Sequence, residues 1–188
     1  VEETALFMPH ADIIYLSGIT LAILTQAARS RLFDMLAGMR ETNGTRVAFD
    51  TNFRPALWED VATTRAAMER MWRITDIALP SIDDEMAISG LESETAVIDR
   101  FADREGDGIA IKRGVRGPVS PHIVEADMPD FPPAETVVDT TAAGDSFNAG
   151  YLAAFLNGAR DLDRMRAGHR LAARVVGAPG AIMPRGAG

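Results

Sequence analysis

The sequence predicts an α/β protein with a mostly parallel sheet, and three observations support this. Short apolar runs rich in β-branched and aromatic residues alternate with longer segments of helical spacing, which is typical of strand–helix–strand units. The runs are apolar nearly throughout, as in strands covered on both faces. Loops with Gly, Asn or Asp follow these runs, and ligands of parallel sheets bind where the strands end.

The first part of the chain contains three of the four expected strands. They cover residues 12–16, 47–50 and 77–79. Helical spacing predicts helices over 21–39, 60–72, 83–89 and 94–104, with Asp60 as the cap of the second. Each strand is followed by a helix, as in a doubly wound sheet.

The second part begins with a predicted strand over 108–112. Residues 118–138 are rich in proline, and we expect an irregular segment with short β pieces at 123–124 and 136–138. Helices are predicted over 144–156 and 162–176, before a tail rich in glycine and proline.

Composition excludes several function classes. The 188 residues carry a net charge of -8 without a basic cluster, which argues against nucleic-acid binding. The absence of cysteine removes disulfides, thiolate metal sites and cysteine nucleophiles. No apolar run has the length of a membrane span and no signal-peptide pattern opens the sequence. A reducing, cytoplasmic location is compatible with this composition.

The stretch DTTAAGDSFNAG, residues 139–150, places small residues and a carboxylate at a predicted helix start. Backbone N–H groups there lack partners within the helix, and the helix dipole adds positive charge. Ala142, Ala143 and Gly144 therefore predict an anion pocket for a phosphate. Asp145 in the first turn is suited to take a proton from a hydroxyl during phosphoryl transfer.

Other interpretations of this stretch remain. Asp and Thr before a helix are commonly caps, and an isolated Thr-x-x-Gly-Asp favours capping. P-loop, protein-kinase, G-x-S-x-G and H-E-x-x-H motifs are all absent. A Rossmann dehydrogenase is the second architecture, although no G-x-G-x-x-G follows a strand.

The longer strings identify a resemblance. DTTAAGDSFNAGYLAAF closely resembles the C-terminal signature of the ribokinase-like (PfkB) sugar kinases. VAFDTNFRPALW, IYLSGIT, PSIDDEMAISG and IAIKRGVRG are similar to further family segments, in the family's order. The resemblance implies a three-layer α/β/α sandwich, with residues 1–188 as the C-terminal part of one kinase domain. The family's N-terminal sugar-binding part and β lid are not recognisable, so we expect a longer natural protein, and relatives often dimerise through that lid.

The resemblance implies roles around the helix start. Asp145 is the catalytic base, and Ala142, Ala143 and Gly144 form the anion hole. Asp139 and Thr141 match positions that help to hold a monovalent cation, often K⁺, with turn and cap stabilisation as an equal alternative.

Substrate, nucleotide and metal residues follow from the other segments. Arg54 is suited to a sugar carboxylate or to ATP phosphates, or alternatively pairs with Glu59 or Asp60. The remaining substrate-binding candidates are Asn52, Gly18 and Ile19. The ATP-binding candidates are Lys112, Gly114, Gly117, Ser81 and Gly144, with residues 177–181 near the adenine.

The Mg²⁺ assignment rests on a departure from the family pattern. Ser81 and Asp84 occupy the family's Asn-x-x-Glu element, and neither residue matches it. Asp84 remains suited to Mg²⁺ through water, and Asp83 and Glu85 add charge beside it. SIDDE is also an ordinary helix start.

The strings are most similar to the branch that phosphorylates 2-keto-3-deoxygluconate to its 6-phosphate with ATP. A fructokinase or ribokinase of the same family is the alternative, and a catalytically silent sugar- or nucleotide-binding protein is an alternative of another class. The three histidines show no ligand spacing, and the methionines are expected in the core.

Overall fold

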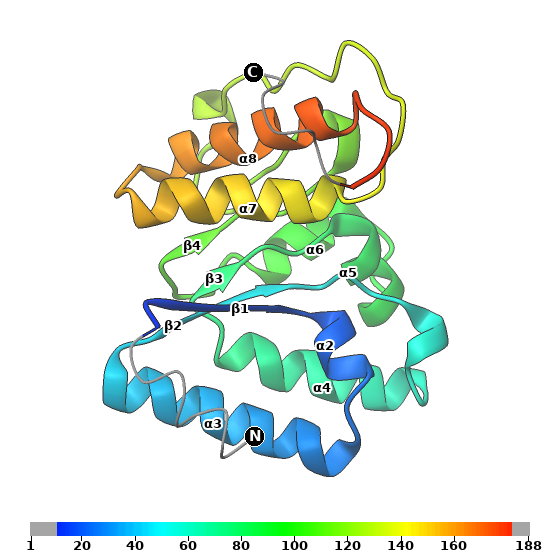
Figure 1. The fold of residues 1–188 in the computed structure, drawn as a ribbon, viewed down its shortest axis with the longest axis vertical. Coiled ribbons are helices and arrows are strands. Elements are labelled where there is room, and N and C mark those ends of the chain that lie inside the picture. The colour runs from blue at the N-terminus through cyan, green and yellow to red at the C-terminus, as the bar shows by residue number, and fades with distance from the viewer. Residues whose placement is uncertain (1–10, 182–188) are drawn as a thin grey trace. The chain divides into compact units, whose positions relative to one another are not determined.

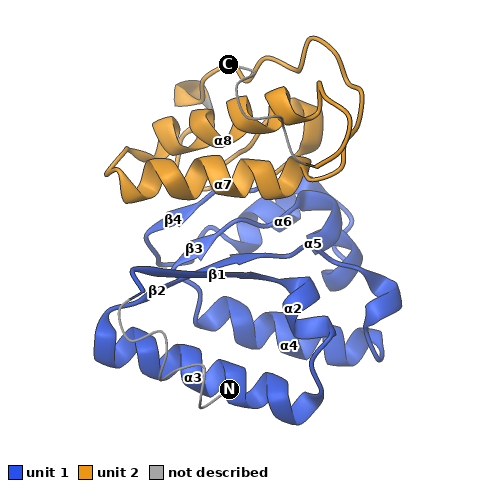
Figure 2. Ribbon diagram, in the orientation of Figure 1, with its two compact units in different colours: residues 1–111 blue, residues 112–188 orange. Residues whose placement is uncertain are grey.

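The structure is a computed structural model that describes residues 11–181. The chain forms two compact units, residues 1–111 and 112–188 (Figure 2). That residues 1–188 belong to a single kinase domain stays a prediction.

Unit 1 contains a four-stranded parallel sheet in the order β1-β2-β3-β4 (Figure 1). The strands are β1 (Ile13–Ser17), β2 (Arg46–Asp50), β3 (Ile77–Ala78) and β4 (Gly108–Ile109). Ser17 pairs with Asp50 in register, so the loops after β1 and β2 leave the same edge of the sheet. The parallel sheet and its intervening helices confirm the predicted α/β class.

Within the described part of unit 1, from residue 11 on, five α-helices connect or follow the strands. They are α2 (Gly18–Ala22), α3 (Gln26–Asn43), α4 (Val61–Arg73), α5 (Ile82–Ser89) and α6 (Glu94–Arg100), and η1 (Pro55–Leu57) is a 3-10 turn. The single helix predicted over 21–39 is wrong: α2 ends at Ala22, and Thr25 caps α3 by accepting the N–H of Ala28 at 3.3 Å. The predicted Asp60 cap is confirmed, since its carboxylate accepts the N–H of Thr63 at 2.7 Å.

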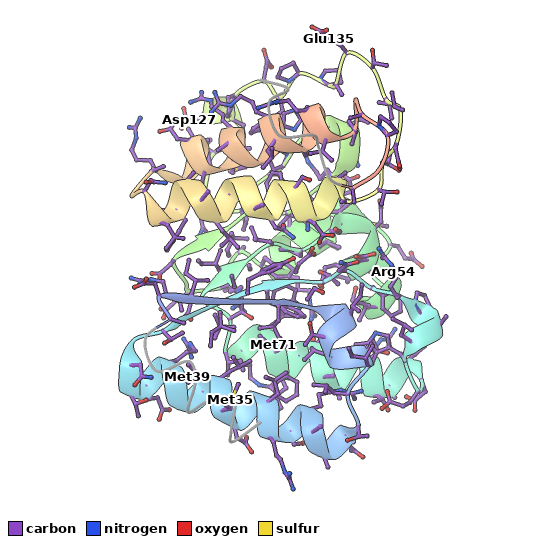
Figure 3. The ribbon with its side chains drawn as sticks, in the orientation of Figure 1. Met35, Met39, Arg54, Met71, Asp127 and Glu135 are labelled. Carbon is purple, nitrogen blue, oxygen red and sulfur yellow. The ribbon has the colours of Figure 1, made fainter. Side chains whose placement is uncertain are left out.

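The core of unit 1 lies between the sheet and its helices. The Trp72 ring meets Phe49 and Phe101 edge to face, with centroid distances of 4.9 and 5.2 Å. Met39 and Met71 are buried between the sheet and helices α3 and α4 (Figure 3). The expectation that methionines fill the core is confirmed for these two.

Unit 2 contains two long helices, α7 (Ala143–Leu156) and α8 (Asp161–Val175), which lie side by side (Figure 1). Glycines allow their close approach: a Cβ on Gly150 would lie 2.7 Å from the Ala167 carbonyl oxygen. The same holds for Gly168, whose Cβ would lie 2.7 Å from the Phe147 carbonyl oxygen. No helix within residues 11–181 is long and apolar enough to cross a membrane.

The β pieces predicted at 123–124 and 136–138 are wrong. Residues 118–138 contain the 3-10 turn η3 (Glu125–Asp127) and a single β-bridge residue, Val119, and are otherwise irregular. Five prolines between 118 and 133 lack the N–H that a sheet ladder needs. The N–H groups of Val138 and Asp139 instead donate to the Val176 carbonyl, at 2.7 and 3.2 Å.

Candidate active site

The loop after β2, residues 51–54, packs closely on the start of α2. A Cβ on Gly18 would lie 2.0 Å from the Thr51 carbonyl oxygen, so only glycine allows this approach. Gly18 is buried and Ile19 is half-buried. Close packing of the loop on α2 therefore explains why residue 18 is glycine. The predicted sugar contacts of Gly18 and Ile19 stay predictions.

Asn52 has an uncommon backbone conformation for a non-glycine residue. Its φ is +32°, and its N–H donates to the Asp50 carboxylate at 3.2 Å. The next N–H, of Phe53, donates to the Asp84 carboxylate at 3.0 Å. Such conformations cost energy and persist only where the surroundings enforce them, and they concentrate at binding sites.

Arg54 is exposed at the end of this loop (Figure 3). One guanidinium nitrogen donates to the Phe53 carbonyl at 2.9 Å. The alternative acidic partners are engaged elsewhere: Glu59 pairs with Arg29 at 3.0 Å, and Asp60 caps α4. The guanidinium therefore presents donors to solvent that suit an incoming carboxylate or phosphate.

The start of α5 brings two neighbouring carboxylates to the same loop. Asp84 receives the Phe53 N–H, and Glu85, which is 1% exposed, accepts the Thr51 hydroxyl at 3.0 Å. Burial raises the pKa of Glu85 to about 7, and Arg100, 3.7 Å from the other carboxylate oxygen, opposes this rise. The sequence indicated Glu85 only as added charge beside Asp84; its burial and its bond to Thr51 were not predicted.

A signal for Glu85 was present in the sequence. Ile82 and Ile88 are buried on α5, and Glu85 lies midway between them at three-residue spacing, on the same helix face. A carboxylate on an apolar helix face indicates a specific partner in the core.

The metal prediction concerns the same turn. Within residues 11–181, no group of three or more acidic or histidine side chains gathers as a metal-binding cluster. Mg²⁺ in kinases is commonly held by one or two carboxylates together with water and phosphates. Asp84, half-buried at the end of the sheet, fits such a role. Ser81 precedes α5 and makes no side-chain cap bond.

In unit 2, the residues of the predicted anion pocket lie at the start of α7. Ala142 adopts a left-handed conformation with φ +61°. The N–H of Ala143 donates to Thr140 O at 3.2 Å, and that of Ser146 to Ala142 O at 2.8 Å. Between them lie Gly144 and the exposed Asp145, in the turn where a helix has no internal acceptors for its N–H groups.

Lys112 reaches the same turn. Its ammonium donates to the Asn148 side-chain oxygen at 3.1 Å, and a Cβ on Gly144 would lie 3.7 Å from its nitrogen. Asn148 is 1% exposed. The structure thus brings Lys112 to the predicted anion pocket. Asn148 was missed, although its place four residues after Gly144 puts both on one helix face.

Asp139 stabilises the turn before α7. Its two carboxylate oxygens accept the N–H groups of Thr141 at 2.8 Å and of Gly180 at 3.0 Å. Hydrogen bonds from Thr141, and then from Gly180, lower the pKa of Asp139. These bonds match the turn-stabilising alternative, and the monovalent cation at Asp139 and Thr141 stays a prediction.

Gly114 and Gly117 border a 3-10 turn, η2 (Gly114–Arg116), with φ of +58° and +74°. A Cβ on Gly117 would lie 2.4 Å from that of Phe131. These glycines are explained by backbone conformation and packing. Their nucleotide contacts, and those of residues 177–181, stay predictions.

Comparison with known proteins supports the kinase interpretation. A family model for the pfkB family carbohydrate kinases matches residues 2–185. The chain is 44% identical to the 2-dehydro-3-deoxygluconokinase of Dickeya dadantii, over 92% of this chain and 56% of that protein. It is 41% identical to the 2-dehydro-3-deoxygluconokinase of Escherichia coli K12, over 98% of this chain and 59% of that protein. The chain therefore spans less than two thirds of the length of these relatives.

Solved structures agree in fold. The fructokinase of Vibrio cholerae, crystallised with fructose, ADP and calcium, superposes with a TM-score of 0.75 at 24% identity, over 92% of this chain and 56% of that one. The aminoimidazole riboside kinase of Salmonella enterica superposes with a TM-score of 0.74 at 26% identity, over 92% of this chain and 58% of that one. The family match over nearly the whole chain shows that the protein belongs to the pfkB family of carbohydrate kinases.

Proposed function

We propose that the protein is an ATP-dependent kinase that converts 2-keto-3-deoxygluconate (2-dehydro-3-deoxygluconate) to its 6-phosphate. The observation that supports this chemistry most is the start of α7, where the exposed Asp145 follows Gly144 and a Cβ on Gly144 would lie 3.7 Å from the Lys112 ammonium nitrogen. The choice of sugar rests on the 2-dehydro-3-deoxygluconokinases, 41% and 44% identical to this chain.

The proposed transfer uses groups of unit 2. Asp145 accepts the proton of the sugar 6-hydroxyl as its oxygen attacks the γ-phosphorus of ATP. The bond from that phosphorus to the β,γ-bridging oxygen breaks, and ADP leaves. Backbone N–H groups of Ala142, Ala143 and Gly144 and the ammonium of Lys112 are assigned to stabilise the charge on the transferred group. The Ala143 N–H, which donates to Thr140 O at 3.2 Å in the structure, would exchange this acceptor for the phosphate.

The remaining contacts with ATP are assigned to Ser81, Gly114 and Gly117. Mg²⁺, when bound through water to Asp84, would neutralise phosphate charge during transfer. A monovalent cation at Asp139 and Thr141 would strengthen the positive field beside the anion pocket. Each of these assignments can be tested by substitution with separate measurement of KM for ATP and for Mg²⁺.

Arg54 is assigned to the carboxylate of the sugar acid. It is exposed, and its two alternative acidic partners are occupied by Arg29 and by the α4 cap. Asn52 lies two residues before it, on the same strained loop. Gly18 and Ile19 are the other proposed sugar contacts. A bidentate pair between guanidinium and carboxylate would favour a sugar acid over a neutral ketose.

A coupled ADP-release assay tests this proposal, using the protein at its natural length with ATP and Mg²⁺. It compares 2-keto-3-deoxygluconate, fructose and ribose for wild type, Arg54→Ala and the control Arg31→Ala, which removes an exposed arginine of α3. We expect preference for the sugar acid, and an increase in its KM of about 10- to 100-fold in Arg54→Ala alone.

Other results would change the assignment. Preference for fructose or ribose would keep the kinase and reject the substrate. A rise in the KM for ATP alone would move Arg54 to the phosphate side. No turnover with any sugar would reject the proposed activity and favour a binding protein on this fold.

A further inference from the structure

Thr51 and Glu85 connect the loop after β2 to the first turn of α5, which follow neighbouring strands of unit 1. Thr51 follows β2, and Glu85 lies in the first turn of α5, just after β3. The Thr51 hydroxyl donates to Glu85 Oε1 at 3.0 Å. Thr51 is 0% and Glu85 1% exposed, so this bond lies wholly inside the unit.

Burying the Glu85 carboxylate at this position is energetically unfavourable. Desolvation penalises a buried charge unless hydrogen bonds and opposite charge compensate. The compensation here is partial, because Arg100, the cation that pairs with Glu85, lies 3.7 Å from its Oε2 and also pairs with Glu69. Ile82 and Ile88 flank Glu85 on α5, so an apolar side chain would suit the same face. The carboxylate therefore indicates a requirement other than packing.

The loop that receives this bond is also held at other points. The Phe53 N–H donates to Asp84, and Gly18 lets α2 contact the Thr51 carbonyl. Between these contacts, Asn52 is kept at φ +32°. A strained residue between fixed neighbours projects its side chain in one direction, because the backbone has no alternative conformation available.

We propose that Thr51 and Glu85 are positioning residues for sugar-acid recognition. Their hydrogen bond fixes the backbone of residues 51–54, so that Asn52 and Arg54 project toward the substrate. The proposal rests on the proposed function, in which Arg54 holds the sugar carboxylate. Neither Thr51 nor Glu85 touches substrate, and both act through the loop.

A purely structural bond would have a different effect. Its removal would lower stability without separating the KM values of the two substrates. The chain offers a matched control in Thr75, which is 3% exposed and donates its hydroxyl to the Met71 carbonyl at 2.8 Å. Thr75→Val and Thr51→Val each remove one buried hydroxyl bond from unit 1 and keep the side-chain shape.

The experiment measures KM for 2-keto-3-deoxygluconate and for ATP, with thermal unfolding, in the protein at its natural length. Thr51→Val should raise the KM for the sugar acid about tenfold and leave that for ATP within twofold. Thr51→Ser, which keeps the hydroxyl, should restore a KM within twofold of wild type. Thr75→Val should lower the melting temperature similarly without changing either KM.

A double-mutant cycle tests whether the Thr51–Glu85 hydrogen bond acts through Arg54. In an Arg54→Ala background, Thr51→Val should raise the KM for the sugar acid by much less than tenfold, because only Asn52 is left for the loop to position. An additive tenfold rise would overturn the proposal, as would an unchanged KM for the sugar acid in Thr51→Val. If the wild-type protein does not phosphorylate the sugar acid, the proposed function is rejected. If the wild-type protein is active and Thr51→Val has an unchanged KM, only the positioning role is rejected.

Discussion

Substituting Gly144 with alanine distinguishes the effect of this residue on turnover from its effect on stability at the start of α7. Gly144 does not have a positive φ, and a Cβ there would meet only the Lys112 ammonium nitrogen, at an ordinary contact distance of 3.7 Å. Alanine is the better helix former by about 0.5–1 kcal/mol. The variant should therefore be at least as stable as wild type, with a melting temperature up to about 4 °C higher.

Gly38→Ala is the matched control. Gly38 lies within α3 and also lacks a positive φ, and a Cβ on it would meet nothing within 4 Å. The same substitution should therefore produce a similar gain in stability at a position without a proposed role. Turnover of Gly38→Ala should stay within about twofold of wild type, because surface helix positions rarely affect a distant site.

Activity should respond differently at Gly144. A methyl group there would fill space that the transferring phosphoryl group needs beside the backbone N–H groups. Loss of one such donor costs about 10²–10³ in turnover, so a decrease of at least about 100-fold is expected. Thermal unfolding and the coupled ADP-release assay measure the two effects on the same preparations. Turnover within threefold of wild type, in a variant as stable as Gly38→Ala, would refute the anion pocket.

Three further predictions concern stability. Burial raises the pKa of Glu85 from 4.5 to about 7, so the native state binds the Glu85 proton more tightly than the unfolded state does. With metal chelated, the contribution of Glu85 to the free energy of unfolding should therefore fall by about 3 kcal/mol as the pH rises through that range. Urea titrations at pH near 5 and near 8 measure this decrease, and Glu85→Gln should abolish it. Gly150→Ala should lower the free energy of unfolding by about 1–3 kcal/mol in urea titrations, because its Cβ would lie 2.7 Å from the Ala167 carbonyl oxygen. Asp60→Ala should cost about 1 kcal/mol in the same assay by removing the α4 cap, while Asp60→Asn should retain most of it.

For each of these three stability predictions, one result would contradict it. Equal pH dependence in wild type and Glu85→Gln would show that Glu85 does not titrate from a raised pKa. A Gly150→Ala variant as stable as Gly38→Ala would contradict the close contact of α7 and α8. Equal stability of Asp60→Ala and wild type would show that the cap contributes nothing measurable.

Local patterns predicted most of the fold. β2 was recognisable as an apolar run, and Asp60 as a cap, because both signals lie within a few residues. The split between α2 and α3 was missed because apolar spacing continues across it, while the Thr25 cap is a weaker local signal. The segment 118–138 was predicted to contain β pieces because its valines outweighed the effect of its prolines on a hydrogen-bonded ladder.

The candidate site was predictable where it lies in one continuous motif. Residues 142–145 form the helix start that the sequence predicted, while the left-handed backbone of Ala142, unusual for alanine, has no local sequence signal. Thr51 and Glu85 are 34 residues apart, and Lys112 and Asn148 are 36 apart. Pairing across such separations depends on how strands and helices pack, which spacing along the chain does not encode.

The most direct test of the central claim is Asp145→Asn in the protein at its natural length. The side chain is exposed in the first turn of α7, so the substitution should leave the melting temperature and the calorimetric affinity for ATP close to wild type. Single-turnover phosphorylation of 2-keto-3-deoxygluconate should fall by about 10²–10⁴-fold, because the amide cannot take the hydroxyl proton. Near-normal phosphorylation by this variant would contradict Asp145 as the base, and with it the proposed mechanism.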